Sequence, residues 1–138
     1  MDIQTTSGPG MERTILCHFN MDTFTKAYVE ALLWSSSGDP ESPLGKEASV
    51  DEISPELMAK IEYDCKNFQL FNSEHFDGNY SQAGHDFALT RNRHGAGFWD
   101  GDWPDPAATL LTDASHVVGE CDLYRGDDGL IYALGPGV

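Results

Sequence analysis

Apolar residues recur at three- and four-residue spacing in three separate stretches of the chain, and this periodicity most limits the folds open to it. The stretches are residues 22–34, 54–71 and 105–118. Such spacing places the apolar side chains on one face of a helix. The sequence therefore predicts three amphipathic helices, with these apolar positions in chain order: Phe24, Ala27, Tyr28, Ala31, Leu32 and Trp34; Leu57, Met58, Ile61, Cys65, Phe68 and Phe71; Ala107, Leu110, Leu111, Ala114, Val117 and Val118.

The ends of these helices carry their own signals. Asp22 or Thr23 can cap the first helix, and Ser54 can cap the second. Asp105-Pro106 is placed to start the third helix, and Gly119 is placed to end it.

Two further stretches are typical of β-hairpins. Residues 86–91 alternate between apolar and polar side chains, which is the pattern of a half-buried strand. Residues 92–95 then offer a tight reversal, and residues 96–100 read as the partner strand. The second hairpin is predicted from strands at 120–125 and 130–134, which are joined by a turn containing Asp-Gly.

The predicted order of elements is α-α-ββ-α-ββ. This order gives an α+β fold in which three helices pack on one face of a small antiparallel sheet made from the two hairpins. A chain of 138 residues has the length of one domain. We expect residues 1–12 to form a flexible leader, residues 13–134 to form a single α+β domain, and residues 135–138 to fray.

Charge limits the classes of partner. The chain has 23 Asp and Glu against 8 Lys and Arg, a formal net charge of −15. Direct binding to nucleic acid or to an anionic membrane needs a basic surface, so both are excluded. The three cysteines form no C-x-x-C pair, which argues against a disulfide framework or a zinc site, and no apolar run is long enough to span a membrane. We expect a cytoplasmic protein with reduced thiols and without a cofactor.

The acidic residues are most one-sided between Asp100 and Asp128. Eight acids there are opposed by Arg125 alone: Asp100, Asp102, Asp105, Asp113, Glu120, Asp122, Asp127 and Asp128. Carboxylates spaced like DNA phosphates would compete for the basic groove of a nucleic-acid-binding protein. The alternative is that these acids only keep the turns soluble and cap a helix.

Three tryptophans add a second binding signal. Trp34 and one of the neighbours Phe98 and Trp99 are expected in the core, because adjacent strand residues face opposite ways. The other neighbour and Trp103 are expected to be exposed beside aspartates, as interface anchors are. Six residues are therefore predicted to contact a basic partner protein: Asp100, Asp102, Trp103, Asp122, Asp127 and Asp128.

Catalysis and metal binding have weaker support. A histidine beside a carboxylate suits acid–base chemistry, but His85 and Asp86 would face opposite sides of a strand, with His94 in the turn. The DGDWPD segment at 100–105 offers oxygen ligands for calcium, yet it lacks the register and the distal Glu of an EF-hand. We expect no catalytic or metal-binding residues, with a small enzyme or metal-binding protein as the alternative.

Four segments, AYVEALLWSS, SPELMAKIEYDCKNFQ, QAGHDFALTRNRHGAGFWD and DLYRGDDGLIYAL, carry a resemblance that covers about residues 20–134. Together they resemble a family of small acidic proteins of bacteriophages and mobile elements that has no assigned function. The resemblance supplies no catalytic residues. It implies a non-enzymatic accessory protein in the cytoplasm of a bacterial host, acting as a DNA mimic against restriction, CRISPR or another DNA-processing enzyme. A virion or assembly component is the second alternative.

Overall fold

Helices make up most of the structure. The computed structural model describes residues 21–38, 40–45, 47–94, 97–100 and 102–138. The elements in order are α2 (Thr23–Ser35), the 3-10 turn η1 (Val50–Glu52), α3 (Pro55–Asn72), the 3-10 turn η2 (Ser73–His75), α4 (Tyr80–Arg91), α5 (Ala107–Val118), β1 (Asp122–Arg125) and β2 (Ile131–Leu134). The predicted α+β class is confirmed, with four α-helices and one two-stranded antiparallel sheet in the described ranges. The predicted leader, residues 1–12, lies outside these ranges.

The end signals of the first two predicted helices are confirmed. The Asp22 carboxylate accepts a hydrogen bond from the Thr25 backbone N–H at 2.8 Å. The Ser54 hydroxyl accepts one from the Leu57 N–H at 3.1 Å, and Pro55 occupies the first turn of α3. Because each cap satisfies a backbone donor that the helix itself leaves unpaired, these residues fix where the helices begin.

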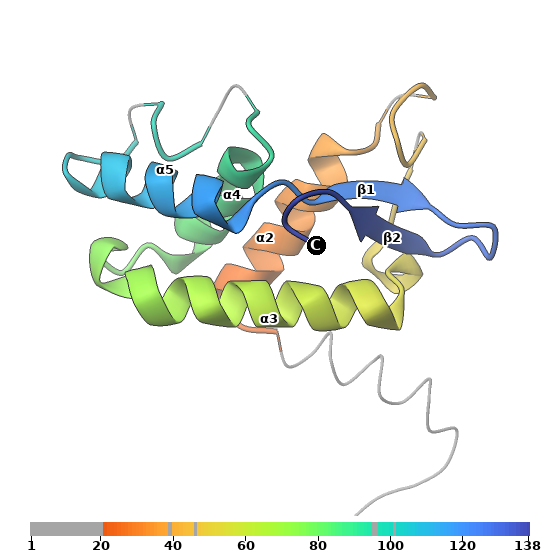
Figure 1. Cartoon of the computed structure of the whole chain (residues 1–138), viewed down its shortest axis with the longest axis horizontal. Coiled ribbons are helices and arrows are strands. Elements are labelled where there is room, and N and C mark those ends of the chain that lie inside the picture. Colours follow the sequence, from red (N-terminus) through yellow and green to blue (C-terminus); the bar gives the residue numbers. More distant parts are fainter. Residues whose placement is uncertain (1–20, 39, 46, 95–96, 101) are drawn as a thin grey trace, which may run out of the picture.

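The C-terminal hairpin is also as predicted. Strands β1 and β2 pair antiparallel, with Tyr124 opposite Tyr132 and their rings stacked at 5.9 Å. The Ser54 N–H donates to the Ile131 carbonyl at 3.0 Å, so the chain entering α3 is tied to the edge of this hairpin. In Figure 1 the hairpin extends to one end of the molecule's long axis, and α3 runs along that axis.

The first predicted hairpin, residues 86–100, is wrong. Tyr80–Arg91 is the helix α4, and every residue from Asp86 to Arg91 is buried. The polar residues of this stretch are buried together with the apolar ones, because α4 lies in the interior and its polar side chains have hydrogen-bond partners there. The chain then turns at Asn92, and Arg93 adopts a positive φ of 59°.

The core is a set of stacked aromatic rings between α2, α3 and α4. The Phe68 and Phe87 rings lie 4.0 Å apart, and Phe24 and Phe76 stack at 5.5 Å. Phe98, from the segment after α4, stacks on Phe68 at 6.0 Å. These rings remove a large apolar area from water, which is the main source of stability in a domain of this size.

A buried arginine connects the core to the end of the chain. The Arg91 side chain is fully buried. Its guanidinium donates to the Asp64 carboxylate at 2.8 Å, to the Tyr28 hydroxyl at 2.9 Å and to the Gly119 carbonyl at 2.8 Å. It also reaches the Gly137 carbonyl at 3.4 Å, and the Gly137 N–H donates to the Glu120 carbonyl at 2.8 Å. The segment expected to fray is therefore hydrogen bonded to the rest of the domain.

Several apolar residues assigned to the core by periodicity lie at the surface. Trp34 is 69% exposed, so its predicted place in the core is wrong. Phe71, Leu110 and Val117 are exposed as well. No helix in the described part of the chain combines the length and the apolar composition needed to span a membrane.

Candidate functional site

The structure separates the predicted partner-binding acids into two groups. Asp100 and Asp102 are exposed in the loop that precedes α5. Asp127 and Asp128 are exposed in the turn between β1 and β2. Figure 1 shows these two places toward opposite ends of the long axis, with Asp122 at the start of β1 between them. The predicted residues therefore do not form one compact site.

Trp103 is not an exposed anchor. Its side chain is only 7% exposed, and its indole N–H donates to the buried Asp86 carboxylate at 2.7 Å. Its ring also meets Phe98 edge to face at 5.4 Å. The prediction was wrong because acidic neighbours suggest that a tryptophan lies in solvent, whereas the loop that carries Trp103 folds back onto α4. Of the neighbours Phe98 and Trp99, Phe98 is buried and Trp99 is 54% exposed, so the expected split between them is confirmed.

Asp128 is engaged within its own turn. Its carboxylate accepts hydrogen bonds from the Leu130 N–H at 2.9 Å and from the Tyr132 hydroxyl at 2.6 Å. These two bonds hold the pKa of Asp128 below its usual value. The hydrogen bond to Asp128 is also the main reason that the pKa of Tyr132 is raised to about 12. Asp127, in the same turn, makes no hydrogen bond with another described residue.

The Tyr132 titration tests this turn. The raised pKa of about 12 means that the folded state favours the neutral phenol, so this contribution to stability is present below the ordinary tyrosine pKa and is lost as pH rises through 12. Asp128→Asn is expected to return the pKa of Tyr132 toward 10, as measured by NMR of labelled tyrosine. Asp127→Asn should leave it unchanged. A Tyr132 pKa that stays near 12 in Asp128→Asn would contradict the assigned hydrogen bond.

An acidic row follows the C-terminal third of the chain. We define it by eight residues that are exposed or partly exposed: Asp100, Asp102, Asp105, Asp113, Glu120, Asp122, Asp127 and Asp128. In Figure 1, α5, β1 and the hairpin turn follow one another along the long axis. The row therefore extends along the molecule and does not gather at one point.

Arg125, the basic residue that the sequence sets against this row, is engaged elsewhere. Its guanidinium donates to the carbonyls of Gly129, Leu44 and Glu47, at 2.9, 3.2 and 3.1 Å. It also forms an ion pair with Glu52 at 3.4 Å. Its charge is therefore balanced by an acid outside the row, and the carboxylates of the row keep their combined field.

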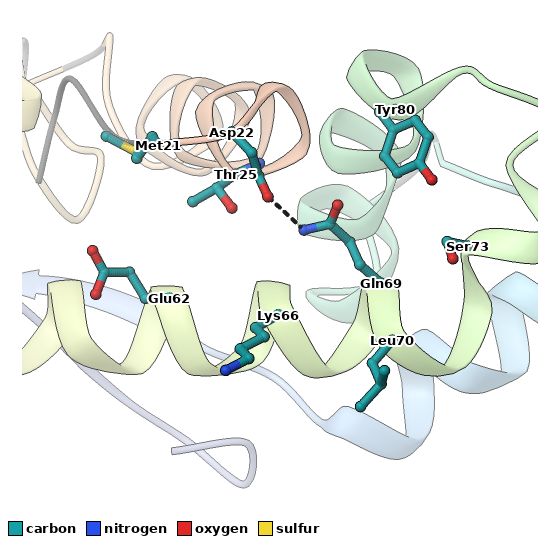
Figure 2. Close-up of a pocket in the computed structure, with 9 residues that line it drawn as sticks. All are labelled: Met21, Asp22, Thr25, Glu62, Lys66, Gln69, Leu70, Ser73 and Tyr80. Atoms are coloured by element: carbon teal, nitrogen blue, oxygen red, sulfur yellow. Dashed lines mark hydrogen bonds between the residues drawn. The ribbon is translucent and has the colours of Figure 1, made fainter.

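A groove lies between the start of α2, the face of α3 and the start of α4 (Figure 2). It has a volume of about 520 Å³. Gln69 rises from α3 and donates to Asp22 at 3.1 Å, while Tyr80 forms a wall from α4. Burial opposes ionisation of Asp22, but hydrogen bonds from Thr25 and Gln69 lower its pKa overall. This carboxylate is therefore occupied in joining α2 to α3.

A smaller groove lies between the loop before α5 and α5 itself, and we call it the Trp99 groove. Its volume is about 340 Å³. Its lining residues are Trp99, Trp103, Asp105, Ala108, Thr109, Thr112 and Asp113. The groove combines one exposed aromatic ring with two carboxylates of the acidic row. This combination suits a cationic ligand.

Comparison with protein-family models, with curated proteins and with solved structures found no match to this chain.

His85 and Asp86 meet, although the sequence argument placed them on opposite faces of a strand. On the helix α4, the His85 Nδ1 lies 3.3 Å from the Asp86 carboxylate, which also accepts from Gln82 and Trp103. His94 follows the other end of α4 and does not join this pair. His85 lines neither groove described above. The geometry gives Asp86 a structural role, which is to hold Trp103 against α4.

The remaining metal and thiol hypotheses have these outcomes. Across the described ranges, no three His, Cys, Asp or Glu side chains are grouped so that they could hold a metal ion, and this includes the acids of the 100–105 segment. The predicted cap at Asp105 is wrong, because its side chain makes no capping hydrogen bond with the backbone of α5. The Asp105 carboxylate instead accepts a hydrogen bond from the Thr109 hydroxyl at 3.0 Å. Cys65 and Cys121 are free and buried, and burial raises the pKa of both thiols. Burial of this kind makes them weak nucleophiles.

Sequence reasoning missed Asp64 and the Trp99 groove. Asp64 is not among the apolar positions predicted to face the core from its helix, but it is 6% exposed and pairs with Arg91. The sequence carried no signal for that pair, since 27 positions separate the two residues. The groove had a partial signal in the adjacent Phe98 and Trp99, one of which had to face outward.

Proposed function

We propose that this is a non-enzymatic protein that binds a basic, nucleic-acid-binding protein through the acidic row and occupies the surface that would otherwise hold nucleic acid. The observation that carries the proposal is the arrangement of α5, β1 and the hairpin turn, which follow one another along the long axis (Figure 1), together with the ion pair between Arg125 and Glu52. A row of carboxylates attracts a basic groove by the same electrostatics as a phosphate backbone.

The resemblance to small acidic phage proteins gives this activity a context. We propose that the partner is a bacterial host enzyme that acts on DNA, such as a restriction or CRISPR nuclease, and that binding inhibits it in the host cytoplasm. Inhibition would follow because the partner's basic groove cannot hold the acidic row and DNA at once.

The test uses two variants that lose equal charge. The row variant is Asp102→Asn, Glu120→Gln, Asp122→Asn and Asp127→Asn, whose side chains make no hydrogen bond with another described residue. The control variant is Glu30→Gln, Glu56→Gln, Glu62→Gln and Glu74→Gln, from α2, α3 and η2. Both remove four charges, and neither removes a buried group, so both should keep the wild-type melting temperature.

The immobilised wild-type protein is exposed to nuclease-treated bacterial lysate, and bound proteins are identified by mass spectrometry. We expect a DNA-binding protein that elutes as salt rises from about 0.05 to about 0.5 M, because screening weakens charge pairing. Duplex DNA should displace it. The row variant should bind it about tenfold more weakly or worse, and the control variant should bind it as the wild type does.

Three results would overturn the proposal. Retention that is independent of salt would remove its electrostatic basis. Equal weakening by both variants would show that net charge, and not the row, attracts the partner. Retention only of particle proteins that DNA does not displace would instead indicate a virion or assembly component.

A further inference from the structure

We propose that the Trp99 groove holds an arginine side chain of the basic partner, with the guanidinium stacked on the Trp99 ring and paired with Asp113. The inference rests on the proposed function for the source of that arginine. The groove shares Asp105 and Asp113 with the acidic row, but the inference has its own test. The groove lies where the loop before α5 meets the first two turns of that helix.

The aromatic ring is the first element of the argument. Trp99 is 54% exposed, although its neighbour Phe98 is fully buried and the nearby Trp103 is held by Asp86. A half-exposed indole leaves apolar area in contact with water, and a stacked ligand would cover that area. A planar guanidinium stacks on such a ring better than an ammonium does, and tryptophan is the strongest partner for cations.

The carboxylates are the second element. Asp113 is exposed, lines the groove and makes no hydrogen bond with another described residue. Asp105 uses one oxygen to accept from Thr109 and keeps the other. A guanidinium offers five N–H donors in a fixed plane, so it can bond a carboxylate with two donors while its face rests on the ring.

The Trp99 ring and the two carboxylates together favour arginine over lysine, whose compact charge needs neither the ring nor the plane. The Thr112 hydroxyl oxygen is buried, so a ligand in the groove does not contact it.

The experiment titrates the whole protein with N-acetyl-arginine amide and follows the three indole N–H signals by NMR, assigned through single tryptophan variants. The lysine and citrulline amides are the comparison ligands, since the first keeps the charge without the plane and the second keeps the plane without the charge. We expect the Trp99 signal to move with the arginine amide and to move much less with the other two.

Trp99→Ala and Asp113→Asn should each weaken arginine binding about fivefold to tenfold. Trp34→Ala is the matched control, because Trp34 is a similarly exposed tryptophan on α2, and it should not change binding. Melting temperatures of all three variants show whether the fold is kept. Equal shifts with arginine and lysine, or arginine binding that survives Trp99→Ala, would overturn the inference.

The two proposals fail in different ways. If the row variant loses the partner while Trp99→Ala keeps full affinity for both the partner and the arginine amide, the groove inference is wrong and the proposed function stands. If the arginine amide binds the Trp99 groove but no DNA-binding protein is retained by the acidic row, the groove stands and the proposed function is wrong.

Discussion

Replacing Arg91 with methionine is expected to destabilise the protein by about 3–5 kcal/mol, the cost of removing one partner from a buried ion pair. Arg91 is fully buried, and its guanidinium donates to Asp64, Tyr28 and two backbone carbonyls. Methionine fills a similar volume but supplies none of these donors. The Asp64 carboxylate, 6% exposed, would keep Lys60 at 3.1 Å as its remaining cation.

Urea denaturation measures this effect, with Arg93→Met as the matched control. Arg93 lies two positions along the chain and is exposed, so its replacement should change the free energy of unfolding by less than about 0.5 kcal/mol. A second variant, Arg91→Met with Asp64→Leu, removes both charges and should recover part of the loss, since the buried carboxylate that lost its guanidinium partner is then removed as well. A loss below about 1 kcal/mol in Arg91→Met would contradict the buried pair.

The parts of the fold that were predicted correctly depend on local chemistry. The caps at Asp22 and Ser54 satisfy backbone donors three positions along the chain, so the local sequence is enough to predict these caps. The C-terminal hairpin follows from its Asp-Gly turn and from short strands on either side. In each case the deciding interactions span only a few positions of the chain.

The helix α4 could not be predicted in this way because distant partners bury its polar residues. Asp86 is satisfied by Trp103, Thr90 by the Phe98 N–H, and Arg91 by Asp64. When those distant partners are unknown, the alternating sequence of this segment is typical of a strand with one polar face. One signal did favour a helix, since Ala, Leu and Gln outnumber the single β-branched residue, Thr90, in this segment.

The same contrast between local and distant interactions applies to the candidate site. Exposure of the acids was predictable, because carboxylates without buried partners lie in solvent. Their arrangement in a row was not, since it depends on α5 and β1 following one another along the molecule (Figure 1). Trp103 was placed wrongly for the reason that applies to α4: its partner, Asp86, lies 17 positions away.

Gly84→Ala is expected to destabilise the protein by about 3 kcal/mol, the upper range for overpacking a core. Gly84 lies in α4, where α2 crosses it. A Cβ atom there would overlap the Phe24 carbonyl oxygen and lie 2.9 Å from the carbonyl carbon. These are backbone atoms of α2, so no side-chain rotation can relieve the overlap. The two helices would have to separate, and the Phe24 and Phe87 rings between them would lose contact.

The sign of this effect distinguishes packing from helix propensity. Alanine is a better helix former than glycine by about 1 kcal/mol, so an isolated helix would gain from the substitution. Ser81→Ala, at an exposed position of the same helix, reports that local preference alone and should change stability by less than about 0.5 kcal/mol. If Gly84→Ala raised the free energy of unfolding, α2 and α4 would not approach as closely as described. The burial of Asp86, Thr90 and Arg91, which depends on that approach, would then lose its basis.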